Sequence, residues 1–261
     1  MFHSPTSAGT PRKLIVFMGP AGSGKTSLTW ALGKWIEKNY GAIVGYVNLD
    51  PGTLRLPYRA DYDVREIITI NDIMSRYNLG PNGAFIKSMD IMLGRVKDIL
   101  QRITAIDKEY VLIDTPGQME LFVFRENGPA MLEVLKKLGQ VVGIIVFDPM
   151  LSRTPTDIAV LKALSIVIQL RLKVESILVV NKLDLLNRNV LSVLDDAEKL
   201  LKEIEKEGHG VFKDMALSLL SICRNYIPPS RLIAVSAKTG EGINELFDVI
   251  HEVFCTCGDL T

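Results

Sequence analysis

The stretch MGPAGSGKTSLTW (residues 18–30) follows the apolar run KLIVFM (13–18) and opens a helical pattern. Residues Gly19 to Thr26 fit G-x-x-x-x-G-K-S/T, which between a strand and a helix is typical of a phosphate-binding loop. Glycines there let backbone N–H groups converge on phosphate oxygens, and the following helix adds its N-terminal partial positive charge. The sequence therefore predicts a loop that holds the phosphates of a nucleotide, with an ordinary glycine turn as the alternative.

Two side chains of this loop carry the chemistry that a nucleoside triphosphate requires. Lys25 is expected to reach the β- and γ-phosphates and to assist catalysis, and the Thr26 hydroxyl is expected to bind a Mg²⁺ ion. The residues predicted to contact the nucleotide in this loop are Gly22, Ser23, Gly24, Lys25, Thr26 and Ser27.

Short apolar runs alternate with longer helical patterns along the rest of the chain. These runs are apolar almost throughout, as expected for parallel strands that are covered on both faces. The rhythm predicts an α/β fold with a doubly wound, mainly parallel sheet and helices on both faces. Strands are predicted at 13–18, 42–49, 110–114, 141–147, 176–181 and 231–236, and helices at about 25–39, 83–105, 128–138, 155–171, 190–207 and 241–254.

One domain over residues 13–261 is expected, preceded by a flexible tail at 1–12. The interval 51–109, between the second and third predicted strands, is far longer than a plain crossover needs. It is predicted to be a helical insertion that carries Gly80-Pro81-Asn82 between two helices. Insertions at the ligand edge of a sheet often carry function.

Composition sets broad limits on partners and location. The 261 residues include 30 Lys and Arg against 30 Asp and Glu, so there is no strong signal for direct nucleic-acid binding, although a local basic patch stays open. The apolar runs are too short to cross a bilayer, and the N-terminus lacks the apolar centre of a secretion signal. The three cysteines, at 223, 255 and 257, lack metal-ligand spacing, and a cytoplasmic location is expected.

Two motifs favour guanine as the base. VVNKLD (179–184) and VSAKTG (235–240) each close a predicted strand at the edge where open α/β sheets bind ligands. Asp184 can accept hydrogen bonds from guanine N1–H and the N2 amino group, whereas adenine presents a lone pair there, a mismatch worth about 10⁴ in discrimination. Asn181 is expected to face the N7 side of the base, the Lys182 stem to pack on the purine, and the Ala237 N–H to meet O6. The predicted base-binding residues are Asn181, Lys182, Asp184, Ser236, Ala237 and Lys238.

Two further strand ends supply candidates for metal binding and catalysis. In LIDTPGQ (112–118), Asp114 is expected to hold Mg²⁺ through a water and the Gly117 N–H to meet the γ-phosphate. Gln118 can orient the attacking water, or it can be a solvent-facing turn residue. In NLDPGT (48–53), Asp50 can reach the Mg²⁺ shell or accept a hydrogen bond from the attacking water, although Asp-Pro-Gly is also a common turn.

These motifs together resemble the GPN-loop GTPases, in the class of P-loop proteins that includes the signal-recognition-particle GTPases and MinD-like ATPases. The resemblance rests on the phosphate loop, NLDP, DTPGQ, NKLD, SAK and Gly80-Pro81-Asn82, in this order over about residues 13–254. It implies a homodimer in which Asn82 of each subunit completes the other's site. It also implies that Asp50 acts on the attacking water. The chain looks like the compact form expected in archaea, and relatives in eukaryotes are linked to RNA polymerase biogenesis, which makes a protein client an expectation.

The function expected from the resemblance is a Mg²⁺-dependent GTPase that hydrolyses GTP to GDP and phosphate as a homodimeric switch or assembly factor. Two alternatives stay open: a GTP-binding assembly factor with little turnover, and a P-loop kinase of a small molecule. Within the insertion, Asp63 and Arg65 are expected to cap or pair, and Arg55, Arg59 and Arg65 are candidate charge donors to the phosphates. Gly-Pro-Asn-Gly is, from local sequence alone, also an ordinary turn.

Overall fold

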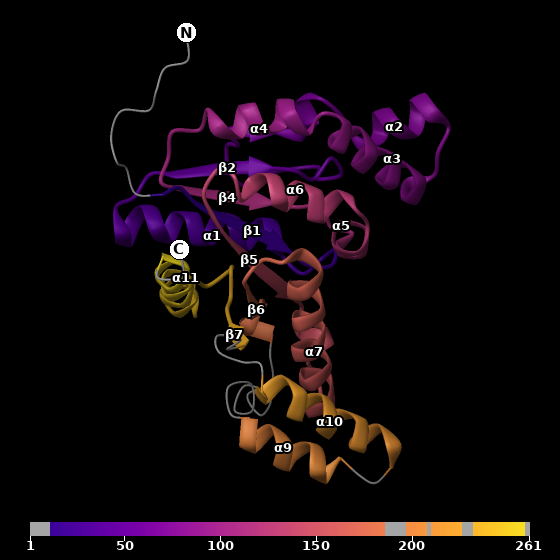
Figure 1. Cartoon of the computed structure of the whole chain (residues 1–261), viewed down its shortest axis with the longest axis vertical. Helices are drawn as coiled ribbons and strands as arrows, with labels where there is room; N and C mark the ends of the chain where they lie inside the picture. The colour runs from indigo at the N-terminus through magenta and orange to yellow at the C-terminus, as the bar shows by residue number, and fades with distance from the viewer. Residues whose placement is uncertain (1–10, 186–196, 208–209, 226–231, 259–261) are drawn as a thin grey trace.

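The computed structural model describes residues 11–185, 197–207, 210–225 and 232–258. In that part of the chain the centre is a parallel sheet of order β3-β2-β4-β1-β5-β6-β7, seen near its edge in Figure 1. The predicted doubly wound fold is confirmed. The strands are β1 (Lys13–Met18), β2 (Val44–Asn48), β3 (Tyr62–Asp63), β4 (Tyr110–Asp114), β5 (Gln140–Phe147), β6 (Ser176–Val180) and β7 (Leu232–Ala234).

Two apolar layers cover the two faces of the sheet. Alternate residues of β1 point to opposite faces, so Leu14 and Val16 join a large cluster under most of the helices, whereas Ile15 and Phe17 join a smaller one under α1 and α11. The helices are α1 (Lys25–Trp35), continued by a π-helical turn (Ile36–Tyr40), α2 (Ile70–Tyr77), α3 (Pro81–Gly94), α4 (Val96–Thr104), α5 (Met119–Phe124), α6 (Asn127–Leu135), α7 (Pro155–Leu172), α9 (Ala197–Lys206), α10 (Val211–Asn225) and α11 (Ile243–Gly258).

The prediction of a single helix at 83–105 is wrong. Two helices, α3 and α4, meet at Arg95, whose φ of −110° and ψ of 18° interrupt the helix directly after Gly94. Glycine weakens a helix because it loses the most backbone entropy. α3 also begins earlier than predicted, at Pro81, where proline's fixed φ suits the first helical position and its missing N–H is not needed. The Gly-Pro-Asn tripeptide therefore starts a helix.

Several elements were not predicted from the sequence. These are β3, which has two residues, the short helix α5 and the amphipathic helix α10. The start of the helix predicted at 190–207 lies outside the described residues, as does most of the tail predicted at 1–12, and α9 covers 197–206.

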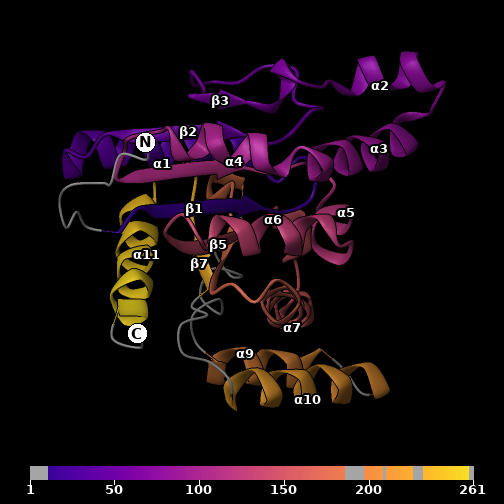
Figure 2. The ribbon, with the colours of Figure 1, turned by 45° about the horizontal axis from the view of Figure 1, so that its top comes forward.

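The interval 51–109 contains β3, a 3₁₀ turn (Val64–Glu66), α2, α3 and α4. α2 and α3 lie beyond the end of the sheet and α4 runs back over it, as Figure 1 and the tilted view in Figure 2 both show. The first residues of α3, Pro81 and Asn82, are exposed. Among the described helices, none combines the length and the apolar composition that crossing a bilayer requires.

Candidate nucleotide-binding site

The phosphate loop joins β1 to α1 and depends on glycine at two close approaches. Gly24, directly before α1, has a φ of 87°, and a Cβ there would lie 2.4 Å from the amide nitrogen of Asn181. Gly19 has a φ of 154°, and a Cβ there would lie 2.1 Å from the carbonyl oxygen of Val146 in β5. Side chains at either position would push the loop away from the neighbouring strand ends.

Lys25 is folded back onto its own loop. Its Nζ donates to the carbonyl oxygen of Pro20 at 3.2 Å, and the residue is buried. Burial lowers the pKa of Lys25, while the charges of Asp114 and Asp50 oppose that shift. The ammonium group therefore has one backbone partner, which a phosphate oxygen can replace.

Asp114 ends β4 as a fully buried carboxylate beside the phosphate loop. Its Oδ2 accepts hydrogen bonds from Thr26 Oγ1 at 2.5 Å and from the Tyr58 hydroxyl at 3.3 Å, while its Oδ1 has no partner in the described part of the chain. Burial raises the pKa of Asp114 to about 6. A buried carboxylate oxygen without a donor, next to a threonine hydroxyl, is the chemistry that Mg²⁺ prefers.

This arrangement fits the predicted Mg²⁺ site in part. Thr26 and Asp114 lie together, and no cluster of three or more His, Cys, Asp or Glu forms a closed metal site in the described residues. An ion here would take most of its remaining ligands from phosphate and water, as Mg²⁺ commonly does. The assignment of Thr26, Asp50 and Asp114 as metal ligands stays a prediction.

Asp114→Asn is expected to stabilise the nucleotide-free protein at neutral pH. The folded pKa of about 6 lies above the ordinary 3.8, so the folded state binds more protons than the unfolded state between these values. Stability therefore falls as pH rises through this window, and the whole penalty, about 3 kcal/mol, is present above pH 6. Urea denaturation with a chelator at about pH 5 and pH 8 measures the part of this fall that lies above pH 5, which is about half of the total. If the variant kept the pH dependence of the wild type, burial of the Asp114 carboxylate would not be its cause.

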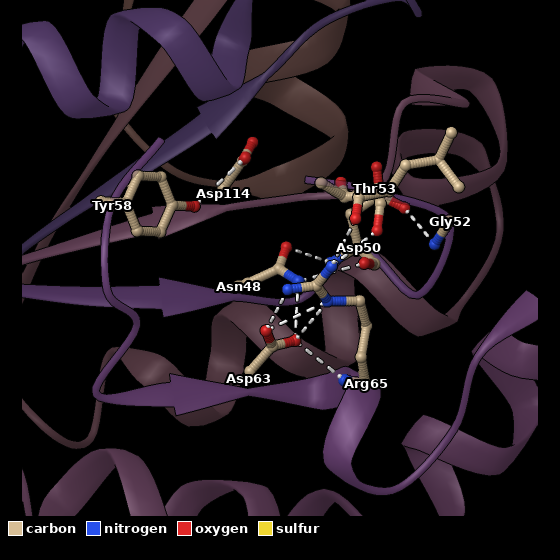
Figure 3. Close-up of polar contacts among 9 residues, drawn as sticks. Asn48, Asp50, Gly52, Thr53, Tyr58, Asp63, Arg65 and Asp114 are labelled. Carbon is tan, nitrogen blue, oxygen red and sulfur yellow. Dashed lines mark hydrogen bonds and ion pairs between the residues drawn. The ribbon is translucent and has the colours of Figure 1, made fainter. Parts of the chain in front are cut away.

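Asp50 lies in the turn that follows β2, drawn in Figure 3. Its Oδ1 accepts from the Gly52 N–H at 2.8 Å, and its Oδ2 lies 3.9 Å from where a Cβ on Gly117 would be. The turn that the alternative interpretation expected is present. The same geometry brings Asp50 and Gly117 together next to Ala21 of the phosphate loop, and the charge of Asp50 acts on Lys25.

The turn also touches the helix that carries the tripeptide. A Cβ on Gly52 would lie 2.7 Å from Phe85 Cζ of α3, so the aromatic ring fills the space that a side chain would occupy. The Ile70 N–H, at the start of α2, donates to the Pro51 carbonyl at 3.1 Å. Helices α2 and α3 are therefore both in direct contact with the Asp50 turn.

Gln118 directly precedes α5. Its carbonyl oxygen accepts from the N–H groups of Leu121 and Phe122, which begins that helix, and the residue is half-buried. The role of its side chain stays a prediction.

Tyr58 was missed by sequence reasoning, because a tyrosine in an irregular loop gives no signal of its contact with Asp114.

Asn181 links the phosphate loop to the base-binding loops. Its Nδ2 donates to the carbonyl oxygens of Ser23 at 3.0 Å and Gly24 at 3.4 Å, and its Oδ1 accepts from the Ala237 N–H at 3.0 Å. Asn181 thus ties the phosphate loop to the segment that follows β7. The Ala237 N–H, which was assigned to guanine O6, is bonded to Asn181 in this structure, and its contact with a base stays a prediction.

Asp184 is oriented by a hydroxyl group. Ser236 Oγ donates to its Oδ1 at 2.7 Å, while the rest of the exposed carboxylate faces a pocket of about 580 Å³. The Lys182 ammonium forms an ion pair with Asp148 at 2.5 Å. The pocket is lined by Gly24, Ser27, Trp30, Pro57, Asn181, Lys182, Asp184, Leu185, Ala237 and Lys238. It thus contains most of the predicted base-binding residues.

Gly80, Pro81 and Asn82 are exposed, and in the described part of the chain Asn82 has no hydrogen bond to the phosphate loop. The structure therefore does not bring this predicted catalytic residue to the site of its own subunit.

Comparison with known proteins decides the family. A family model described as a conserved hypothetical ATP binding protein matches residues 17–256. GPN-loop GTPase PAB0955 of Pyrococcus abyssi is 39% identical over 257 residues, which cover 95% of this chain and 100% of that protein. The chain belongs to the GPN-loop GTPase family. The crystal structure of apo PAB0955 superposes on this GPN-loop GTPase with a TM-score of 0.84 at 37% identity, covering 94% of this chain and 98% of that one.

Relatives in eukaryotes are longer. GPN-loop GTPase QQT2 of Arabidopsis thaliana is 31% identical over 244 residues, which cover 90% of this chain and 62% of that protein. GPN-loop GTPase 1 of Dictyostelium discoideum is 28% identical over 247 residues and is covered to 60%. The description of the family model names ATP, whereas these relatives are named GTPases. The carboxylate of Asp184 in the base pocket favours the second description.

Proposed function

We propose that this GPN-loop GTPase hydrolyses GTP to GDP and phosphate, with Mg²⁺, as a homodimer whose nucleotide state controls its assembly with a protein client. The observation that carries this proposal is the convergence of Lys25, Asp50 and Asp114 at the phosphate loop. The pocket holding Asp184 adjoins that loop, since Gly24 and Ser27 line it.

Each residue of the site has a distinct role in the proposed hydrolysis. Lys25 exchanges the Pro20 carbonyl for a γ-phosphate oxygen, and the Gly117 N–H donates to the same group. Asp50 accepts a hydrogen bond from the attacking water, and the Gln118 amide orients that water. A Mg²⁺ ion held near Thr26 and Asp114 would neutralise charge on the β- and γ-phosphates.

Phosphate release without an added acceptor molecule distinguishes a GTPase from a small-molecule kinase and from a GTP-binding assembly factor with little turnover. The wild-type protein is expected to release phosphate from GTP with Mg²⁺ in repeated turnovers, and not from ATP. Release that occurs only with an added small molecule would indicate a kinase. Binding of GTP without release would indicate a structural GTP-binding assembly factor.

We further propose that Asn82 acts in trans. Its exposure at the start of α3, beyond the end of the sheet, leaves it available to a second subunit. Proline at the first helical position fixes the loop, so that Asn82 presents its carboxamide at little entropic cost. A client related to RNA polymerase assembly and a cytoplasmic location are carried over from the family resemblance as proposals.

Mixing two inactive variants is expected to restore activity. Asn82→Ala keeps its phosphate loop, and Lys25→Ala keeps its Asn82, so a mixed dimer has one complete site. Random exchange at equal ratio makes half of the dimers mixed, and phosphate release should reach about a quarter of the wild-type rate.

The matched control is Asn71→Ala, an exposed asparagine on the neighbouring helix α2, which should remain active alone. Differently tagged subunits verify that exchange has taken place. If exchange is complete and the mixture stays inactive, Asn82 acts within its own subunit or only starts the helix.

A further inference from the structure

The guanidinium group of Arg65 holds two separate parts of the chain. Its Nε donates to both carboxylate oxygens of Asp63 at 3.0 Å, and its Nη2 donates to Asp63 Oδ2 at 2.6 Å. Its Nη1 donates to the carbonyl oxygens of Thr53 at 2.8 Å and Leu54 at 3.3 Å. The expected pairing of Arg65 with Asp63 is thus present, whereas the expectation that Arg65 is a free charge donor to the phosphates is not met.

Asp63 connects Arg65 to β2. It lies opposite Asn48 in the parallel pair of β2 and β3, and its Oδ1 accepts from Asn48 Nδ2 at 2.8 Å. Asn48, which is completely buried, then binds both backbone groups of Asp50: its Oδ1 accepts from the Asp50 N–H at 3.0 Å, and its Nδ2 donates to the Asp50 carbonyl at 3.2 Å.

The turn from Asp50 to Thr53 is therefore held at both ends by one ion pair. Arg65 holds the Thr53 end directly, and Asp63 holds the Asp50 end through Asn48, as Figure 3 shows. Inside the turn, the carboxylate of Asp50 is fixed by the Gly52 N–H. The direction of this carboxylate toward the phosphate loop thus depends on the pair.

We propose that Arg65 and Asp63 are positioning residues for hydrolysis, which hold the Asp50 carboxylate in place for the attacking water. This inference rests on the proposed function, because it assigns a purpose to the geometry around Asp50. Misplacement of a reacting group by about 1 Å can cost about a hundredfold in rate, so a rigid turn has a direct kinetic benefit.

The surroundings of the pair are suited to this role. The side chains of Arg65 and Asp63 are only 25% and 17% exposed, which limits screening by water and salt. Burial alone would raise the pKa of Asp63, but hydrogen bonds from Arg65 and Asn48 outweigh it and hold that pKa below its usual range. Lysine cannot replace Arg65, because a point charge cannot bind a carboxylate side-on and also reach two carbonyl groups.

The test compares Arg65→Gln and Arg65→Lys with the wild type for kcat and for GTP affinity. Arg65→Gln is expected to lower kcat about tenfold to a hundredfold and to change GTP affinity less than about threefold. Arg65→Lys should recover only part of kcat. The matched control is Arg102→Gln, which removes an exposed ion pair to Glu66 on the same 3₁₀ turn and should leave kcat unchanged. Thermal denaturation confirms that each variant is folded.

A double-mutant cycle separates positioning from general stability. If Arg65 acts through Asp50, then Arg65→Gln should have no further effect on single-turnover hydrolysis in an Asp50→Ala background. Independent multiplication of the two losses would overturn the inference, as would a folded Arg65→Gln variant with wild-type kcat. If Asp50→Ala itself kept full turnover, the proposed role of Asp50 would fail instead, so the two failures are distinguishable.

Discussion

Asp184→Asn is expected to convert this GTPase into one that prefers xanthosine triphosphate. In the proposed complex the carboxylate would accept from two donors of guanine, and the amide of the variant would meet the N2 amino group with a donor of its own. Xanthine carries a 2-oxo group there, which can accept from the amide. Selectivity for GTP over the xanthine nucleotide should fall by about 10⁴ or more, because an unpaired buried donor is heavily penalised.

The Ser236 hydroxyl should assist this exchange. It donates to Asp184 Oδ1 in the wild type, and it can donate in the same way to the carbonyl oxygen of asparagine, which leaves the amide nitrogen for the base. Competition binding with GTP, ATP and xanthosine triphosphate measures the change. Wild-type selectivity in this variant would show that the NKLD motif does not bind the base.

Asp50→Ala is expected to bind GTP and hydrolyse it about a hundredfold more slowly than the wild type, or slower still. Loss of a group that accepts a proton or hydrogen bond from the attacking water costs about 10² to 10⁴ in rate. Nucleotide affinity should change little, because Thr26, Lys25 and the loop N–H groups remain. Single-turnover hydrolysis and equilibrium binding measure the two quantities separately.

Asp50→Asn is the informative control for this variant. An asparagine oxygen can still accept from the Gly52 N–H, so the turn is retained while the carboxylate charge is lost. Slow hydrolysis by both variants would assign the effect to the charge. Full activity of Asp50→Asn would return this residue to the role of turn former.

The sequence predicted the sheet well because parallel strands buried on both faces are continuous apolar runs, as in KLIVFM at 13–18, which became β1 with the same bounds. The phosphate loop and NKLD were predictable because each is local and has a required position at a strand end. β3 was missed because two residues carry no period, and its role comes from its pairing with β2.

The contacts that fix the site were not predictable in the same way. Tyr58 reaches Asp114 across 56 positions of sequence, and Arg65 reaches the Thr53 carbonyl across 12. No periodicity encodes such pairs, since they depend on the path of an irregular segment. The pairing of Asp63 with Arg65, two positions apart, was predictable from the sequence, whereas the contact of Arg65 with the Thr53 carbonyl was not.

The contact between Phe85 and Gly52 has a mechanical consequence for the whole molecule. Close-packed side chains transmit displacement because no free volume absorbs it. A displacement of α3 at its exposed end would therefore reach the turn that holds Asp50 through the ring of Phe85. A displacement of α3 by a bound partner would thus be transmitted to the turn that carries Asp50.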